Sequence, residues 1–277
     1  MAPRNITRSK ILLPLLLVLG GSIFPLHGHG DLDVEIAALT REIDAEPTAE
    51  RFLKRGELRR EHGEFEAAME DYTEATALDS KLDLVLYCRG RALFESGKPE
   101  QARQSLDRFL ERKAASSEGY LTRARVLAAL KDYKAAAEDY TRSIGCTKDP
   151  RPDHFLERAE VLVNAGELDS AVRGLDEGMA SLGAVPTLQS ATIGIEVQLA
   201  RFDAALARID RLVAAAERKE SWLILRAEVL AKAGRPDDAR RSYQDALSAI
   251  EALPPRLRTL PATVELETKA RTGVTAR

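Results

Sequence analysis

The sequence reads EDYT at residues 70–73 and reads EDYT again at residues 138–141. Two interpretations are open. The tetrapeptide belongs either to a chemical site present in two copies, with carboxylates and a phenol for acid–base work, or to one position of a repeating structural unit. Because the two copies are offset by 68, which is twice 34, the second interpretation predicts that other residues recur at intervals of 34.

Three columns of residues follow this period. An alanine recurs six times at a spacing of 34 or 35: Ala68, Ala102, Ala136, Ala171, Ala205 and Ala239. Twelve residues before each alanine lies a column that is small except at its fifth member: Gly56, Gly90, Ala124, Ala159, Ile193 and Ala227. Four residues after each alanine lies a large apolar residue: Tyr72, Leu106, Tyr140, Leu175, Ile209 and Tyr243. Six copies in one register exclude coincidence.

Each unit shows the spacing of two helices. In the first unit Phe65, Ala68, Met69 and Tyr72 step by three or four along one stripe, as on a helix face. A glycine breaks the pattern in the middle of four units: Gly63, Gly97, Gly166 and Gly234. We therefore predict pairs of helices of roughly 13 residues joined by a tight turn. The small column allows the two backbones to approach closely, and the large apolar residue fills the space beside them.

These units resemble the tetratricopeptide repeat. The first reads AERFLKRGELRREHGEFEAAMEDYTEATALD at residues 49–79, and the sixth includes LILRAEVLAKAGRPDDARRSYQDAL at residues 223–247. The resemblance covers residues 49–248 as six repeats. It implies an all-α fold, a right-handed superhelical solenoid of antiparallel helix pairs. Repeat five departs most from the pattern, and its first helix is the weakest of the predicted elements because of three substitutions: Gln189, Ile193 and Glu196.

The segments beside the repeats are predicted to cover the ends of the stack, because a terminal repeat has no neighbour to bury its apolar face. Residues 31–46 carry Ile36, Leu39 and Ile43 at helical spacing before Pro47. This pattern predicts a capping helix.

Residues 249–277 are predicted to form a C-terminal capping helix and a loose tail. Pro254 and Pro255 end the last repeat helix. Gly273 suits the position after a helix end, so the closing helix is expected to run to about Arg271. Four apolar residues are expected to face the repeats: Leu257, Leu260, Val264 and Leu266.

Residues 1–30 differ in kind from the rest of the chain. An apolar run, ILLPLLLVLGGSIF, occupies residues 11–24, and no acidic residue occurs before Asp31. Three basic residues precede the run: Arg4, Arg8 and Lys10. This is the pattern of a secretory signal peptide, and the run is shorter than the roughly 20 residues of a membrane-spanning helix. We expect cleavage before Asp31 and export to the periplasm or the exterior, without a membrane span in the mature chain. The alternative is a retained anchor through residues 11–24.

The net charge of the chain argues against general nucleic-acid binding, and its cysteine content argues against a disulfide framework. The chain has 41 basic and 44 acidic residues, and loss of residues 1–30 removes three basic residues and no acidic one, which leaves a formal net charge of −6. An acidic domain is a poor general binder of nucleic acid. Cys88 and Cys146 lie at unequal places in different repeats, so we expect two unpaired thiols.

Motifs for catalysis are lacking. The SGK within ESGKPEQA, residues 95–102, does not form a phosphate-binding loop, because Ala92 stands where the first glycine should be and Pro99 follows the lysine. GxSxG, HExxH and CxxC do not occur. We therefore expect no enzyme activity, no cofactor and no metal.

The four histidines are too few and too scattered for a metal site in the mature chain. His62 and His154 fall at predicted helix ends and are expected to be solvated. One alternative stays open at residues 27–33, HGHGDLD, which could bind copper or nickel beside a free amino terminus if the signal peptide were cut earlier.

The EDYT tetrapeptide belongs to the second helix of its repeat, where its tyrosine occupies the large apolar column. Each EDYT aspartate is preceded at the same interval by an arginine beside the small column, Asp71 by Arg55 and Asp139 by Arg123. We predict a salt bridge between the two helices of each of these repeats. The other arginines of this column are expected to have other partners or to face solvent: Arg89, Arg158 and Arg226.

In proteins with this resemblance, the first helices of the repeats line a concave groove that commonly holds an extended peptide or a partner helix. The residue after the small column is then expected to point into the groove: Glu57, Arg91, Arg125, Glu160, Gly194 and Glu228. Tyr87 is expected nearby as an apolar contact. Because the planar arginine fork suits carboxylates, we hypothesise that Arg91 and Arg125 grip an acidic stretch of a partner. The alternative is a solvated charged face.

Two functions follow as expectations. The first is an exported, non-enzymatic scaffold that binds a protein or peptide in its groove. The second is a structural or assembly subunit of a cell-envelope complex that uses its convex side or its helix edges. Recognition of a chaperone's C-terminal tail is not expected, because Leu53, Glu57 and Arg91 do not reproduce the asparagines and lysines of the family's carboxylate-gripping members.

Overall fold

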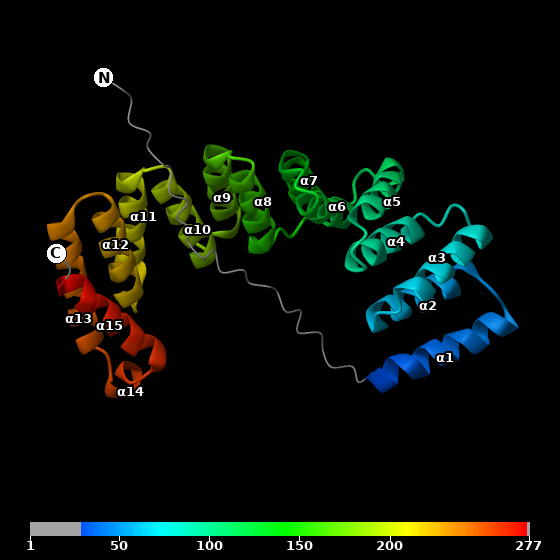
Figure 1. Ribbon diagram of the computed structural model, residues 1–277, viewed down its shortest axis with the longest axis horizontal. Helices are drawn as coiled ribbons and strands as arrows, with labels where there is room; N and C mark the ends of the chain where they lie inside the picture. Colours follow the sequence, from blue (N-terminus) through cyan, green and yellow to red (C-terminus); the bar gives the residue numbers. More distant parts are fainter. Residues whose placement is uncertain (1–28, 276–277) are drawn as a thin grey trace, which may run out of the picture. The chain divides into compact units, whose positions relative to one another are not determined.

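The computed structural model describes residues 29–275, and that part of the chain consists of α-helices without a strand (Figure 1). The predicted all-α fold of antiparallel helix pairs is confirmed. The helices belong to two compact units, Met1–Leu82 and Asp83–Arg277. The predicted signal peptide lies outside the described residues except at its last two positions, because α1 begins at His29. None of the described helices is long and apolar enough to cross a membrane.

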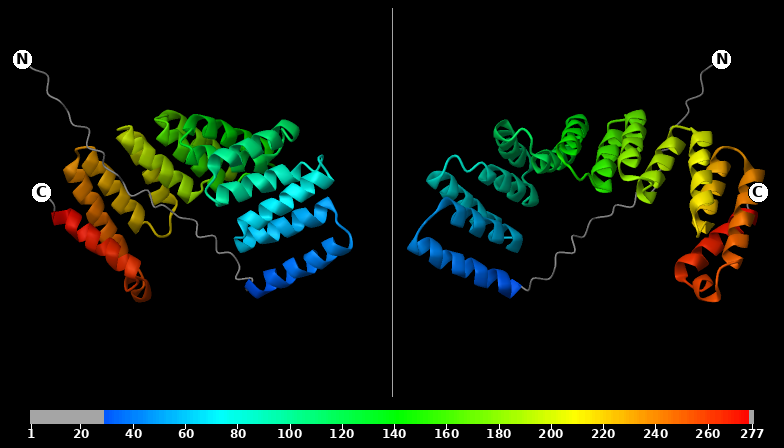
Figure 2. Two further views of the ribbon diagram at one scale, coloured as in Figure 1. Left: turned by 45° about the vertical axis from the view of Figure 1, so that its right-hand side comes forward. Right: turned by 180° about the vertical axis from the view of Figure 1, so that it is seen from behind.

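The first unit contains three described helices that pack side by side (Figures 1 and 2). They are α1 (His29–Ala45), α2 (Ala49–His62) and α3 (Phe65–Leu78). Helix α1 packs on α2 and buries Leu39 and Ile43. Helix α2 begins after Thr48, whose hydroxyl accepts the backbone N–H of Arg51 and so satisfies one of the unpaired donors of the first turn.

The second unit contains five further helix pairs and two closing helices. The pairs are α4 (Leu84–Glu95) with α5 (Pro99–Arg112), α6 (Ser117–Ala129) with α7 (Tyr133–Cys146), α8 (Pro152–Asn164) with α9 (Leu168–Leu182), α10 (Pro186–Gln198) with α11 (Phe202–Ala215), and α12 (Glu220–Lys232) with α13 (Pro236–Glu251). The closing helices are α14 (Pro255–Arg258) and α15 (Pro261–Thr275). Within this unit each second helix packs on the first helix of the next pair (Figure 2).

Each turn between the two helices of a pair contains one residue in the left-handed conformation, at the same position. Four of the six are glycines with φ between 72° and 86°: Gly63, Gly97, Gly166 and Gly234. In the third and fifth repeats Lys131 (φ 62°) and Ala200 (φ 55°) take the same conformation. The backbone N–H that follows bonds back across the turn, as from Glu64 to the Arg59 carbonyl at 2.8 Å. This is the Schellman arrangement, which closes the first helix and reverses the chain.

The core follows the three columns of the sequence. The six alanines of the first column are buried, and so are five of the six large apolar residues, Tyr243 being half-buried. At Gly56 an added Cβ would lie 2.6 Å from the Tyr72 ring, and at Gly90 it would lie 2.7 Å from the Leu106 side chain. Such distances are too short for any side chain, so glycine lets the two helices of these repeats approach.

Repeat five forms its first helix, α10, despite its departures from the pattern. Ile193 is buried in the core. Thr192 stands where the other repeats carry an arginine beside the small column, and Arg208 of α11 supplies a cation instead. The Arg208 guanidinium lies 2.9 Å from the buried Glu196 carboxylate of α10 and 2.9 Å from Asp176 of α9. Three helices are therefore tied by one arginine.

The closing helix differs from the prediction. Helix α15 runs to Thr275 instead of ending near Arg271, and Gly273 lies inside it. A Cβ added at Gly273 would overlap the Tyr243 ring, so this glycine serves close packing on α13 and not a helix end. Small residues, Thr263 and Ala270, are buried there.

Two of the apolar residues that were expected to face the repeats do not do so. Leu260 and Val264 are exposed, whereas Leu257 and Leu266 are half-buried. The pattern of large apolar residues misled the prediction, because α15 packs through small side chains against an aromatic ring.

Candidate interaction surface

The EDYT aspartate forms the predicted salt bridge in the first repeat. The Arg55 side chain of α2 bonds both carboxylate oxygens of Asp71 of α3, at 2.7 Å from Nη2 and 3.1 Å from Nε. Arg59 adds a bond of 2.9 Å to the same buried carboxylate. A buried carboxylate needs such partners, because burial of an unpaired charge is costly. The prediction for this pair is confirmed.

The second copy repeats the arrangement. Arg123 of α6 bonds Asp139 of α7 at 2.6 Å and 2.9 Å. The same guanidinium also reaches Asp107 of the preceding repeat at 2.8 Å. The role of the tetrapeptide's aspartate is therefore to join helices. Of the remaining arginines in the column, Arg158 bonds the Gly174 carbonyl and Arg226 bonds Asp210.

The EDYT tyrosines connect the core to the first helices of the repeats through their hydroxyl groups. Their rings are buried, but the Tyr72 hydroxyl donates to Glu57 at 2.6 Å and the Tyr140 hydroxyl donates to Glu157 at 2.8 Å. Burial, and then the charge of Glu157, raise the pKa of Tyr140. The phenol therefore stays protonated and acts as a fixed hydrogen-bond donor.

Arg125, a predicted groove residue, is already bound within the protein. Its guanidinium makes two bonds to Glu157 of α8, at 2.7 Å and 2.8 Å, so the pair links repeats three and four. Burial opposes the ionisation of Glu157, but the bonds from Arg125 outweigh it and hold the pKa of this carboxyl below its ordinary value. Glu157 was missed in the sequence, although it lies one helical turn before Glu160 on the same helix.

Arg91 and Tyr87 lie together on α4. The Arg91 guanidinium carbon stands 5.7 Å from the centre of the Tyr87 ring, within the range of a cation–π interaction. The Tyr87 ring also contacts Phe109 of α5, with ring centres 5.4 Å apart. Across the repeat boundary the Thr122 hydroxyl donates to the Tyr87 hydroxyl at 3.4 Å. Tyr87 is thus held between α4, α5 and α6.

The remaining predicted residues occupy three other helices. Glu160 is exposed on α8. Glu228 of α12 is half-buried and accepts a 2.5 Å contact from Lys269 of α15. In the first unit Glu57 of α2 receives Tyr72 and also pairs with Arg60 at 3.3 Å. Glu57, Arg125 and Glu228 therefore have partners within the protein. Of the acidic residues that were predicted to line the groove, Glu160 is the most exposed.

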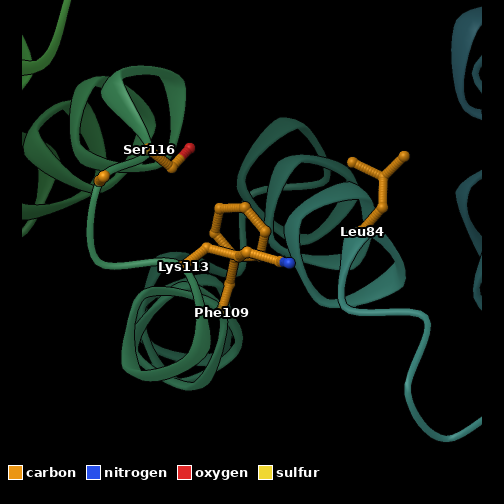
Figure 3. A pocket seen from close by; sticks show the side chains of 5 residues that line it. Leu84, Phe109, Lys113 and Ser116 are labelled. Atoms are coloured by element: carbon orange, nitrogen blue, oxygen red, sulfur yellow. The ribbon is translucent and has the colours of Figure 1, made fainter.

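A separate apolar pocket of about 380 Å³ lies where α4 begins, α5 ends and α6 begins (Figure 3). The Phe109 ring and the Lys113 side chain lie together at the end of α5, with Leu84 on α4 and Ser116 before α6 (Figure 3). Phe109 fits because Gly119 of α6 faces it, where an added Cβ would lie 2.7 Å from the ring. The pocket therefore offers an apolar wall with one amine at its rim.

The Asp83 carboxylate forms ion pairs with two basic side chains beside this pocket. Its carboxylate lies 3.0 Å from Arg112 and 3.4 Å from Lys113. The hydrogen bond from Arg112 holds the pKa of Asp83 below its usual value. A second hollow, of about 450 Å³, lies over α12 and α13, and polar or charged residues line it: Arg226, Arg235, Asp238, Arg241, Gln244 and Asp245. Its arginines pair with aspartates, namely Asp210 and Asp238.

His154 contradicts the prediction that it is solvated. It is buried in the first turn of α8, where its Nδ1 accepts the Arg151 backbone N–H at 3.4 Å. Its Nε2 has no hydrogen-bond partner among the described residues. Burial, and then the charge of Arg151, lower the pKa of His154. Helix α7 packs against α8, so one side of the helix start is buried, whereas Asp153 on the same turn is exposed.

Two further observations concern reactive groups in residues 29–275. Cys88 is buried and Cys146 is exposed, and no disulfide bond joins the two, as predicted. No cluster of three or more histidine, cysteine, aspartate or glutamate side chains suited to a metal ion occurs in this part of the chain.

The tetratricopeptide repeat family profile matches residues 87–151 and 195–255 of the chain. These two stretches cover most of the second and third repeats and most of the fifth and sixth. A search of curated proteins found no match.

Several solved structures resemble the chain. A tetratricopeptide repeat protein from Parabacteroides merdae ATCC 43184 is 18% identical, with 87% of this chain and 93% of that chain covered and a TM-score of 0.52. The C-terminal part of a TPR repeat-containing protein from Cytophaga hutchinsonii is 14% identical, with 87% and 96% covered and a TM-score of 0.65. YrrB, a TPR protein with an unusual peptide-binding site, is 14% identical, with 73% and 97% covered and a TM-score of 0.50. The helix pairs of this chain therefore have the fold of tetratricopeptide repeats.

Proposed function

We propose that this protein is a non-enzymatic scaffold that holds a protein or peptide partner against the first helices of its repeats. The observation that carries the proposal is a wall of polar side chains on α4, α6 and α8 that is tied across repeats by the Tyr87–Thr122 and Arg125–Glu157 bonds. Side chains that are ordered before binding lose less entropy when a partner arrives. The likeness to tetratricopeptide repeat structures supports the same class of function by analogy.

The partner contact is proposed to centre on Arg91, and an acidic stretch is the partner chemistry that fits it. Arg91 lies over the Tyr87 ring, and such a cation presents its outer edge to a carboxylate. Arg125 would join only by exchanging Glu157 for a carboxylate of the partner, because both of its bonds are already made. Glu160 would then face a neutral or basic part of the partner.

Replacement of Arg91 by glutamate tests this proposal. The immobilised protein with Arg91→Glu should capture at least about tenfold less of its partner from a cell-envelope extract, since a like charge now faces the acidic stretch. The matched control is Arg103→Glu on α5, an exposed arginine on the second helix of the same repeat. Undiminished capture by Arg91→Glu, at unchanged helicity, would reject the groove contact.

The second candidate function is an assembly subunit that binds through helix edges, and the apolar pocket beside Leu84 is the observation that favours it. A partner seated there would be lost with Leu84→Asp, which places a carboxylate in an apolar wall. The same partner would still be captured by Arg91→Glu. The two variants therefore separate the two candidate functions in one experiment.

We also propose export after removal of residues 1–30, with a retained anchor through residues 11–24 as the alternative. In the mature chain α1 would precede six repeats at residues 49–248, and residues 249–277 would close the stack. The intact mass of the protein from its native cell tests this: a mass that begins at Asp31 supports cleavage, and the mass of the uncut chain supports the anchor. A cut before His27 would instead leave the histidines of residues 27–33 beside the amino terminus.

A further inference from the structure

The exposed large apolar residues of the described chain lie at three points along the sequence. Five such side chains are exposed among residues 29–275. Leu78 and Leu84 flank the boundary between the two units. The other three lie on the first and last helices: Val34 (67% exposed) on α1, and Leu260 (41%) and Val264 (47%) at the start of α15. The terminal helices of a repeat array normally have a polar outer face for solubility, so these residues call for an explanation.

The outer face of α1 carries mostly small side chains and is acidic at its edges. It lies opposite the buried Leu39 and Ile43, and its exposed residues are mostly small: Val34, Ala37, Arg41 and Ala45. Helix α1 carries five carboxylates against one arginine. Three of the carboxylates are exposed and form no ion pair with another described residue: Asp31, Glu35 and Asp44. Small side chains of this kind let another helix approach closely.

The outer face of α14 and α15 has the opposite charge. The two helices carry four basic residues against two acidic ones. Arg256 and Arg258 are exposed and form no ion pair with another residue of the described part. Beyond the apolar pair of Leu260 and Val264 the face continues with short neutral side chains, those of two exposed threonines, Thr268 and Thr272. Glu265 forms no ion pair among residues 29–275, and its charge is opposite to that of Arg41, the single arginine of the α1 face.

We propose that these two faces bind each other between copies of this chain, so that α1 of one copy packs against α14 and α15 of the next. Each face contributes apolar residues to a centre and charges of opposite sign to a rim, which is the composition of a protein interface. The two surfaces differ from each other, so the contact is head-to-tail and leaves a free face at either end of every assembly. The faces are small, so the association is weak and depends on concentration.

Two blocked variants test the head-to-tail contact. Val34→Asp blocks the α1 face, and the double variant Leu260→Asp with Val264→Asp blocks the α15 face. Each replaces exposed side chains, so the fold is retained and circular dichroism checks it. In sedimentation equilibrium the average mass of the unaltered protein, with its amino terminus determined by intact mass, should rise with concentration. Each blocked variant alone should associate at least about tenfold more weakly, because a carboxylate must be desolvated in the contact.

The decisive sample is an equal mixture of the two blocked variants. Each variant keeps the face that the other lacks, so the mixture should form a dimer and nothing larger. Leu78→Asp is the matched control, an exposed leucine outside both faces, and it should associate as the unaltered protein does. A tenfold rise in the concentration of NaCl should weaken the association, because the rim charges are screened.

Three results would overturn the proposal. The unaltered protein could stay monomeric at all concentrations. Either blocked variant could still associate alone, which would mean that like faces meet. The mixture could fail to form a dimer while the unaltered protein associates. None of these results bears on partner capture through Arg91, so this inference and the proposed function fail separately.

Discussion

Arg123 holds two carboxylates of very different exposure. The Asp139 side chain is 2% exposed and that of Asp107 is 45% exposed, although both bond the same guanidinium. A solvated carboxylate gains little from an ion pair, because water already stabilises it. The loss of a buried pair leaves polar groups without partners. The two aspartates therefore offer an internal comparison.

The first prediction uses this comparison. Asp139→Ala should lower the free energy of unfolding by about 2 kcal/mol, because Arg123 and Arg142 both lose a buried partner. Asp107→Ala should lower it by less than about 1 kcal/mol. Urea denaturation followed by circular dichroism measures both. Equal losses for the two variants would show that burial does not set the strength of this bond.

The second prediction concerns pH. His154 has a lowered pKa in the folded protein, so the unfolded chain binds its proton at higher pH than the folded chain does. The unfolded state therefore gains protons first as the pH falls through about 6.5, and stability drops from that pH downward. His154→Asn keeps an acceptor for the Arg151 N–H but does not titrate.

Denaturation midpoints between pH 7.5 and pH 5.5 measure this difference. The fall of the midpoint should be steeper in the unaltered protein than in His154→Asn. His62→Asn controls for the loss of one imidazole from the first unit. The same slope for the unaltered protein and for His154→Asn would rule out the buried imidazole as the cause.

Spacing alone was enough to predict the Arg55–Asp71 and Arg123–Asp139 bonds, since the interval that both pairs share places the two side chains on facing helices of one repeat. It was not enough for Glu157. The bonds of that carboxylate depend on where the Tyr140 hydroxyl emerges from the core and on the distance between two repeats, neither of which the repeat period contains. The burial of His154 likewise depends on the neighbouring pair of helices.

At the scale of elements, the turn within each pair shows how the chain tolerates a residue other than glycine in a left-handed conformation. Gly166 and Ala200 occupy the same left-handed position in successive repeats, with φ of 79° and 55°. Nothing lies within 4 Å of a Cβ added at Gly166, so an alanine there would cause backbone strain but no steric clash. A left-handed conformation costs roughly 1–2 kcal/mol for a residue with a side chain.

The third prediction is a reciprocal exchange at these turns. Ala200→Gly should raise the free energy of unfolding by about 0.5 kcal/mol, because the relief of strain exceeds the extra entropy of glycine in the unfolded chain. Gly166→Ala should lower it by about 1 kcal/mol. Thermal or urea denaturation of both variants measures the two changes. A loss of stability in Ala200→Gly would contradict the argument.

The existence of the helix pairs followed from the sequence, because small residues, large residues and glycines recur together in each unit. The closing helix did not. Leu260 and Val264 suggested a packed stripe, but Gly273 allows α15 to pack on the Tyr243 ring through Thr263 and Ala270. Large apolar residues mark the buried side of a helix only where the neighbouring surface has room for them.

At the scale of the whole molecule, the period runs through residues 49–248 without a break, yet the structure divides between Leu82 and Asp83. The columns describe contacts within a repeat and do not record where the chain separates into compact units. For the same reason the sequence placed Arg91 and Arg125 on one face but did not predict that Arg125 is bound to Glu157.

The first helices of the repeats, and not the second ones, are proposed to meet the partner. A photo-crosslinking amino acid placed at Glu160 on α8 or at Arg173 on α9, two exposed positions of the same repeat, tests this choice. Irradiation in the native cell, followed by mass spectrometry, identifies the covalent adducts. We expect a partner adduct from position 160 and none from position 173. An adduct from position 173 with none from position 160 would show that the partner meets the second helices instead.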